Sequence, residues 1–499
     1  MNYRRLIASV IVTLVLISWG SPNEKNTKNE KKVLTKKEMI EDYNTFQSIY
    51  KNANSGLYKY HTKLEIDSVF RVNEQLITEG LSYREFYSVI WNVIDYTGSC
   101  HNTLRYPYAL DEELNKQNIF FPLPLKYING KLYSNSKAKG ISVGSEILSV
   151  NTISGAEFSK RVSRYVSTDG FNMTGKYASI ENDWLPFYIY LVLGEQQEFI
   201  IKYLDKKTSQ IKESKVKSVT YTKFYKNYQN RFSKPYDTRK EEDYTYKYVD
   251  SIKTGIIEVN TFNIGGPKTE GHKRYANFLD SVFRQLKEAN IPNLMVDIRG
   301  NGGGNDPNDL LFYSYLAQRN FRENTTAFTL FQHIPNEVHY VYDDVDELRE
   351  ELEEEHSIMK VGKYYQNETF NGFWQPNKNK FDGNLIVLID PFVASAGSLF
   401  ASLIKSDERA LLIGEETLGG YYGHTGHIPV IYELPNSHLN VKFSIVDIEQ
   451  DVKQLPDENY GDGVKPDFKV VQTLEDFLKH KDTQLAFAIE KIRVQNEKK

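Results

Sequence analysis

The chain has 499 residues, with 62 Lys or Arg against 66 Asp or Glu and a formal net charge of −4 at pH 7. So balanced a charge gives no electrostatic argument for binding nucleic acid, and the length is enough for two to four domains. The one cysteine, Cys100, excludes an intrachain disulfide and leaves the redox compartment undetermined.

The first twenty residues are typical of a secretory signal peptide. Two arginines precede an apolar run from Leu6 to Trp19, which is too short for a comfortable membrane span. We therefore predict a signal peptide at 1–20 and an exported protein, periplasmic or extracellular, with an uncleaved anchor as the alternative. Ser21 stands where a bacterial lipoprotein needs a cysteine, so lipidation is not supported. The Lys-rich residues 21–37 are predicted to be a flexible tether.

Two domains are predicted next along the chain. From Met39 to Tyr96 apolar residues recur at three- and four-residue spacings, which indicates helices. Gly98 ends that pattern in YTGSCHNTL and leaves His101 in a loop or a cap. After this point the apolar residues alternate with a period of two and the apolar segments become shorter, which indicates a β-rich module. We place a helical domain at 38–112 and a β-rich domain at 113–225.

Beyond Thr254 strand and helix patterns alternate, which predicts a mostly parallel α/β sheet. Buried strands are predicted at GIIEVNTF, NLMVDIRG, LIVLI and ALLIG. The acidic segment from Asp343 to Glu355 is predicted to be a solvated helix, and Leu474 to Ile492 an amphipathic tail helix. Residues 226–499 are thus predicted as one α/β domain of a multidomain α+β protein.

Ser395 lies where one of these buried strands turns into a helix, in LIVLIDPFVASAGSLFASL. Such a turn presents a side chain at the carboxyl edge of the sheet, where open α/β folds build their sites. The amides of Ser395 and Ala396 lie at the helix N-terminus, with donors free to receive negative charge. The simpler interpretation is a small-residue helix cap.

A second strand-to-helix turn carries Gly302, Gly303 and Gly304. If its strand is a parallel neighbour of the Ser395 strand, both turns lie at one edge of the sheet. Glycines let backbone amides approach a substrate closely, as an oxyanion hole beside a nucleophile requires. The segment lacks the spacing of nucleotide-binding loops; a merely tight turn is the alternative.

A serine nucleophile needs a base, and the sequence offers four. Lys405 follows Ser395 by almost three helical turns, about 15 Å, and cannot reach it. His424 and His427 are expected in a loop after a Gly-rich turn. His101 could approach if the helical segment packs over the edge, and spacing alone does not choose among the three histidines.

Four motifs in order resemble the tail-specific, or C-terminal-processing, serine peptidase family: VDIRGNGGG, VASAGSLFASLIK, IGEETLGG and GDGVKPDFKV. The similarity covers roughly Thr254 to Val471 and implies a ClpP/crotonase-like catalytic core. The preceding module, with GSEILSV, looks like the family's PDZ-like domain. The segment GSCHNT is similar to the N-terminal region of the family's tricorn-like branch.

The resemblance implies that Ser395 is the nucleophile and that oxyanion donors come from Gly303, Gly304 and Ala396. The Ser–Lys branch has its lysine in the Gly-rich turn after the GE-x-T motif, where this chain has Gly420. The chain is therefore more similar to the tricorn-like branch, which uses a histidine as base. By that resemblance His101 is the base.

Other positions of the implied site are less fixed. Cys100 lies where the tricorn-like branch can have a serine, and Asp462 and Glu458 are candidate acids in the segment before GVKPD. Ser398 stands where the family often has Glu. The resemblance implies protein or peptide substrates, with the PDZ-like module binding extended peptide by strand addition. No cofactor is required, and no clustered His, Cys and Asp spacing suggests a metal.

Two alternatives to a Ser–His peptidase stay open. A non-catalytic relative that binds peptides could also lack the family lysine, although it need not keep both VASAG and GNGGG. A cysteine nucleophile at Cys100 beside His101 is disfavoured, because adjacent side chains in an extended segment point apart. The sequence leaves the oligomeric state open.

Overall fold

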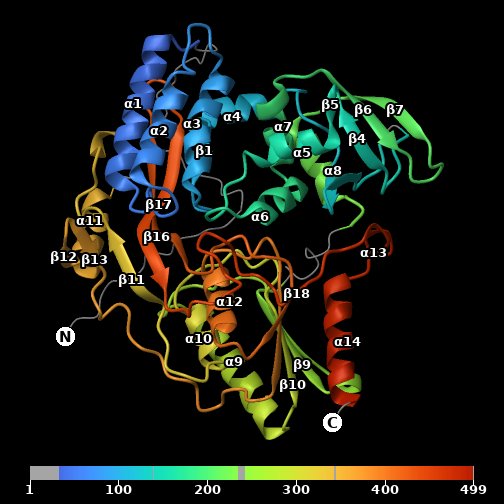
Figure 1. Cartoon of the computed structure of the whole chain (residues 1–499), viewed down its shortest axis with the longest axis vertical. Coiled ribbons are helices and arrows are strands. Elements are labelled where there is room, and N and C mark those ends of the chain that lie inside the picture. Colours follow the sequence, from blue (N-terminus) through green and yellow to red (C-terminus); the bar gives the residue numbers. More distant parts are fainter. Residues whose placement is uncertain (1–32, 139, 234–241, 342–343, 498–499) are drawn as a thin grey trace.

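The computed structural model describes residues 33–138, 140–233, 242–341 and 344–497 (Figure 1). The predicted signal peptide and residues 21–32 of the predicted tether lie outside these ranges. Leu34, near the end of that tether, is buried, and a helix begins two residues later. Within the described ranges, no helix combines the length and the apolar character needed to cross a membrane.

The N-terminal unit is helical, as predicted, and its helices are capped by their own sequence. A Ser or Thr and a Glu three residues later form a reciprocal capping box at the start of each of the first three helices. Gly98 ends the third helix in the left-handed conformation, φ 67°. The elements are α1 (Lys36–Ala53), α2 (Lys63–Glu74), α3 (Tyr83–Thr97), β1 (Thr103–Arg105) and α4 (Tyr108–Asn115).

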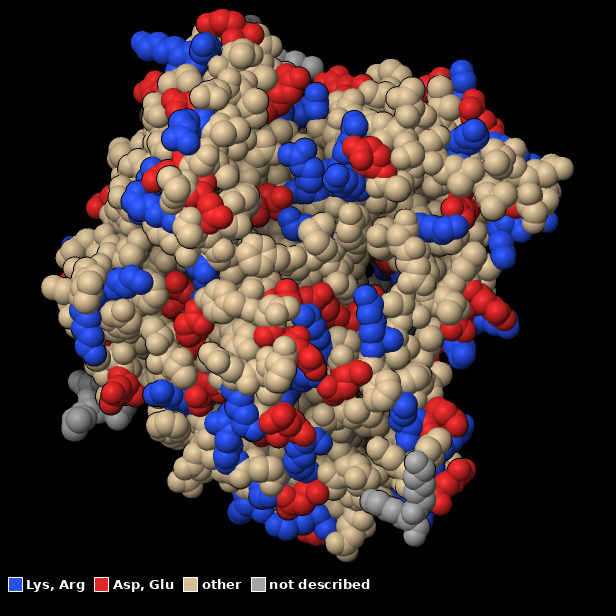
Figure 2. All heavy atoms as spheres, viewed as in Figure 1, with Lys and Arg blue, Asp and Glu red and all other residues tan. Residues whose placement is uncertain are grey.

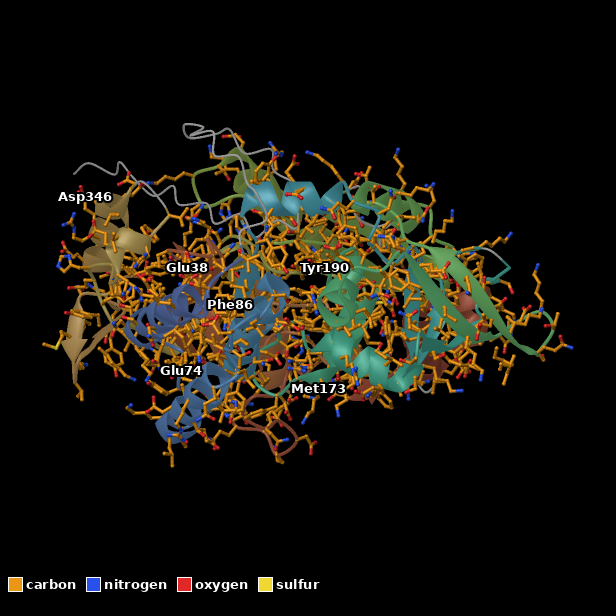
Figure 3. All side chains as sticks on the ribbon, turned by 90° about the horizontal axis from the view of Figure 1, so that it is seen from above. Glu38, Glu74, Phe86, Met173, Tyr190 and Asp346 are labelled. Carbon is orange, nitrogen blue, oxygen red and sulfur yellow. The ribbon has the colours of Figure 1, made fainter. Side chains whose placement is uncertain are left out.

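The β-rich module is one antiparallel sheet with strand order β2-β3-β4-β6-β7, and β5 pairs with β4. Viewed from above, it lies beside the N-terminal helices, with Met173 and Tyr190 on the module and Phe86 on α3 (Figure 3). Its strands are β2 (Leu125–Ile128), β3 (Lys131–Ser134), β4 (Glu146–Val150), β5 (Ile153–Ser154), β6 (Glu198–Leu204) and β7 (Ile211–Lys217). Its helices are α5 (Gly155–Ser163), α6 (Met173–Ala178), α7 (Leu185–Leu193) and α8 (Tyr221–Gln229).

The predicted parallel sheet has the order β18-β15-β14-β10-β9-β8, and only β8 runs antiparallel to its neighbour among these strands. Its central strands are buried on both faces, which explains their continuous apolar sequences. The strands are β8 (Tyr244–Val249), β9 (Thr254–Val259), β10 (Asn293–Asp297), β14 (Asn384–Ile389), β15 (Leu411–Gly414) and β18 (Phe468–Lys469).

Helices cover both faces of this sheet (Figure 1). One face packs on α9 (Glu270–Glu288), α10 (Asn308–Ser314) and α12 (Ala396–Ser406), and the other on α14 (Thr483–Glu497). The predicted single tail helix is instead two, α13 (Leu474–Leu478) and α14, because the chain turns between them.

A third sheet was not predicted, and it joins distant parts of the chain. Its order is β1-β17-β11-β13-β12, with β16 also paired to β17, and all its pairs are antiparallel. Strand β17 runs beside α1 to α3 and packs on them (Figure 1). The elements are β11 (Asn324–Thr329), α11 (Val345–Glu355), β12 (Ile358–Lys360), β13 (Lys363–Tyr365), β16 (Gly423–Glu433) and β17 (Asn440–Gln450).

The acidic segment, the two later histidines and the C-terminal domain can be compared with their predicted structures. The acidic segment does form a helix, α11. His424 and His427, expected in a loop, lie on strand β16. The residues 226–499 predicted as one α/β domain hold both the parallel sheet and most of the third sheet.

On the face shown in Figure 2, acidic and basic side chains are interspersed.

Candidate active site

Ser395 follows strand β14 and immediately precedes helix α12, as predicted. Its backbone has φ 53° and ψ −130°, a conformation that a non-glycine residue holds only at a cost of about 1–3 kcal/mol. The side chain caps no helix amide and is partly exposed. The strained turn therefore places a partly exposed serine at the carboxyl edge of the sheet.

The glycine turn lies against Ser395 because β10 and β14 are parallel neighbours. A Cβ added to Gly303 would lie 2.7 Å from Cβ of Ser395 and 2.9 Å from the amide nitrogen of Ala396. Gly303 also has φ 97°. This close approach therefore requires glycine.

The predicted oxyanion donors differ in their availability. The amide of Gly303 donates to Oδ1 of Asn301 at 2.9 Å. The amides of Gly304 and Ala396 meet no acceptor among the residues that the structure describes. A developing negative charge beside Ser395 thus has Gly304 and Ala396 as candidate free donors.

The third sheet holds the segment that carries His101. It follows Gly98 and precedes β1, whose pairing with β17 holds the N-terminal unit against the later part of the chain. On the other side of β17, strand β16 carries His424. The rings of His101 and His424 stack with their centroids 5.7 Å apart.

Cys100, His101 and Asp169 form a cluster, of which the sequence analysis named Cys100 and His101 but not Asp169. The Cys100 amide donates to Oδ1 of Asp169 at 2.8 Å, and its Sγ lies 3.5 Å from Nδ1 of His101. The expectation that the two adjacent side chains point apart is wrong, because residues 100 and 101 form a turn and not an extended strand. The Cys100 thiol also contacts the backbone of Ser395.

Asp169 belongs to the β-rich module, between α5 and α6. Its Oδ2 accepts the amide of Gly420 at 3.0 Å. The sequence around it, STDGFN, gives only the signal of a turn. An acid that is 69 residues away from Cys100 could not be assigned to the site from that pattern.

The surroundings of the cluster set its protonation. Burial lowers the pKa of His101; Asp169 acts in the opposite direction, and Lys442 and His427 lower the pKa further. Burial, followed by the charge of Asp169, raises the pKa of Cys100 well above its usual value. The imidazole is therefore neutral and the thiol protonated at neutral pH, which suits a histidine base and disfavours a thiolate nucleophile.

The side chains of the two acids proposed from the sequence make other contacts, although their segment meets the Asp169 loop, where the Phe171 amide donates to the Gly461 carbonyl oxygen at 2.7 Å. Asp462 pairs with Lys465 and Asn459. Glu458 is buried, accepts the amide of Lys465 at 3.2 Å, and burial raises its pKa to about 7. Neither carboxylate is among the principal groups that shift the pKa of His101.

The remaining candidate bases are engaged in other contacts. Lys405 pairs with Asp467, as its distance along the helix predicts. Nε2 of His427 lies 2.6 Å from Oε1 of Glu323.

Gly420 and Ser398, the two departures from the family pattern, are tightly placed. A Cβ at Gly420 would lie 2.5 Å from the Gly423 carbonyl oxygen, so no lysine side chain fits there without movement. The Ser398 hydroxyl donates to the carbonyl oxygen of Ser395 at 2.8 Å.

Comparisons with known proteins find a family model and similar folds. Residues 253–470 match the model of peptidase family S41, a range that includes Gly303, Gly304 and Ser395 but not His101. The structure of mature CPAF complexed with lactacystin is similar in fold, with a TM-score of 0.58 at 13% identity over 92% of this chain and 97% of that one. The photosystem II D1 C-terminal processing protease aligns with a TM-score of 0.38 at 13% identity over 87% and 92% of the two chains. Over residues 253–470 the chain is therefore similar to peptidase family S41, which supports a serine-type peptidase.

Proposed function

We propose that this peptidase is an exported endopeptidase that cleaves protein substrates through an acyl-enzyme on Ser395, with His101 as the general base. The observation that carries the proposal is the close approach of the strained Ser395 turn and the glycine turn at one sheet edge, with the Cys100 thiol near the Ser395 backbone. The export part rests on the apolar run of the first twenty residues.

In the proposed reaction, Ser395 Oγ attacks the peptide carbonyl while His101 takes the hydroxyl proton. The amides of Ala396 and Gly304 stabilise the negative oxygen of the tetrahedral intermediate. His101 then gives its proton to the leaving amine, which departs and leaves an ester on Ser395. A water molecule, deprotonated by His101, hydrolyses that ester.

The His101 ring also has a backbone hydrogen bond with Thr425. We propose Nε2 as its reacting nitrogen. Nδ1 faces the Cys100 thiol, whose residue is anchored by Asp169 through the backbone amide. Asp169 also attracts positive charge on the ring, because it raises the pKa of His101. We assign Asp169 and Cys100 positioning roles, in place of Asp462 and Glu458.

The β-rich module is proposed to bind extended peptide as a PDZ-like domain. Its sheet ends in strands β2 and β7, and an edge strand offers unpaired backbone groups to an added strand. Asp169 comes from this same module, so a bound peptide would lie on the unit that anchors Cys100.

A peptide-binding relative without catalysis is the second candidate. Gly420 in place of the family lysine is the observation that favours it. It predicts a folded protein that binds peptides and does not react with serine-directed reagents.

Fluorophosphonate labelling of the purified protein tests the proposal. We expect labelling of the wild type, none of Ser395→Ala, and a rate at least about 100-fold lower for His101→Ala, because a serine without its base is a weak nucleophile. Ser398→Ala is the matched control, since this buried serine lies one turn along α12, and it should keep the label.

Each outcome decides between the candidates. Labelling that survives in His101→Ala would contradict this histidine as base and point to His424. No labelling of a folded wild type would replace the peptidase mechanism with the binding function.

A further inference from the structure

Three different metal-binding side chains converge beside Ser395. The ligand atoms of Cys100, His101 and Asp169 all lie within 4.8 Å of one another. We propose that these three residues form a zinc site, and that zinc bound there inhibits the peptidase. The binding is independent of the proposed function, whereas the inhibition rests on it.

The distance between the sulfur and nitrogen ligand atoms matches the distance expected around a zinc ion. A tetrahedral zinc with a Zn–S bond of about 2.3 Å and a Zn–N bond of about 2.0 Å separates the two ligand atoms by about 3.5 Å. The distance from Cys100 Sγ to His101 Nδ1 is 3.5 Å. The site therefore needs little rearrangement at two of its three ligands.

The third ligand is held in place by the backbone. Oδ1 of Asp169 accepts the Cys100 amide at 2.8 Å, and Oδ2 accepts the Gly420 amide at 3.0 Å. A carboxylate oxygen retains further lone pairs after accepting one hydrogen bond, so each can still bind a metal. Carboxylates that bind zinc commonly accept hydrogen bonds of this kind, which hold the ligand in orientation.

Binding exchanges a proton for the metal. The Cys100 thiol loses its proton to solvent and binds zinc as thiolate, neutral His101 gives its Nδ1 lone pair, and Asp169 binds as carboxylate. The fourth position is left for water.

The proposed inhibition follows from the histidine tautomer. A metal on Nδ1 of His101 leaves the one ring proton on Nε2. That nitrogen then has no lone pair with which to take the proton of Ser395. Zinc thus removes the base without touching the nucleophile.

A second cluster supplies a matched control. Asp306, Glu323 and His427 also have ligand atoms within 4.8 Å of one another, but they include no thiol. Nε2 of His427 already forms a hydrogen bond with Oε1 of Glu323, at 2.6 Å. The thiol distinguishes the site at Cys100, because soft sulfur ligands favour zinc. A cobalt ion bound to a thiolate also has a characteristic absorption band, so the sulfur ligand can be detected directly.

The binding test uses Ser395→Ala, so that metal binding is measured without catalysis. Titration with Co²⁺ should produce a thiolate-to-cobalt charge-transfer band that saturates at one equivalent, and Zn²⁺ should displace it. Cys100→Ser in the same background should lose the band and bind Zn²⁺ more than about 100-fold more weakly. His427→Gln should retain the band.

The results separate binding from inhibition. No band, or zinc binding lost in His427→Gln and kept in Cys100→Ser, overturns the site. In wild type, Zn²⁺ should slow fluorophosphonate labelling more than tenfold, and EDTA should restore it; unchanged labelling at saturating zinc overturns the inhibition. A wild type that never labels, even in EDTA, contradicts the proposed function and leaves the cobalt result standing.

Discussion

Asp169 joins two backbone amides from different parts of the chain, those of Cys100 and Gly420. A neutral carboxamide can accept one of these bonds through its oxygen, but its NH₂ group cannot accept the other. It also removes the charge that favours a protonated His101. A change at this one residue should therefore affect the reaction while the bound substrate is held as before.

Asp169→Asn should lower kcat by about 10- to 100-fold and change KM by less than about twofold, because the base is misplaced in the transition state. Steady-state hydrolysis of a peptide substrate measures both constants. Asp462→Asn is the control, since Asp462 pairs with Lys465, and its kcat should stay within about twofold of wild type. Equal losses in both variants would place the acid at neither position.

The pH dependence of labelling should report His101. Burial lowers its pKa, so the neutral base should appear as the pH rises through a midpoint below about 6.5. The titratable groups around the ring are Asp169, Cys100, Lys442, His424 and His427. The measurement is the fluorophosphonate labelling rate against pH, in EDTA.

Asp169→Asn gives the sign control for that profile. Asp169 raises the pKa of His101, so its neutralisation should move the acid limb to still lower pH. If the acid limb of the pH–rate profile moved to higher pH, or stayed in place, another group would control the labelling rate.

At the scale of elements, the site depends on how closely the two strand-to-helix turns meet. Gly303→Ala should abolish labelling, because the new Cβ would lie 2.7 Å from Ser395 Cβ and the residue has φ 97°. Gly302→Ala is the matched control, since a Cβ there meets nothing within 4 Å, and it should label within about threefold of wild type. A normal rate in Gly303→Ala would show that the turns separate freely.

The sequence was sufficient to predict these two turns. Strands such as β10 and β14 are apolar throughout because both faces are buried, and parallel neighbours must end at the same edge. The contact between Gly303 and Ser395 follows from that rule. The hairpin of β16 and β17 was missed, because Gly426 and Pro429 interrupt the alternation and a register shift lies between them.

The acid that we propose for the site could not be predicted from the sequence. Asp169 lies in a loop of another module, and its place beside Cys100 depends on how that module packs. The choice among the histidines had the same limit. His101 is distinguished from His424 and His427 by the pairing of β1 with β17, which no local pattern encodes.

At the scale of the whole molecule, one buried carboxylate ties the first helix to the late hairpin. Asp42 of α1 accepts the amides of Asn436 and Ser437 at 2.8 and 2.7 Å, in the turn between β16 and β17. It is fully buried. The N-terminal unit and the third sheet therefore share a charged contact as well as an apolar core.

Asp42→Ala should destabilise this junction by about 3 kcal/mol, because two buried backbone donors lose a charged acceptor. Chemical denaturation followed by tryptophan fluorescence measures the loss. Glu41→Ala, an exposed neighbour on the same helix, should change stability by less than about 0.5 kcal/mol. Equal stability of the two variants would show that the hairpin docks without Asp42.

The pairing of β1 with β17 also fixes when activity can arise. His101 is made early and Ser395 late, and the strand that holds the His101 segment in place ends only at Gln450. A growing chain that stops before that strand has the proposed nucleophile and no base beside it. On the proposed mechanism, such an unfinished chain would be inactive.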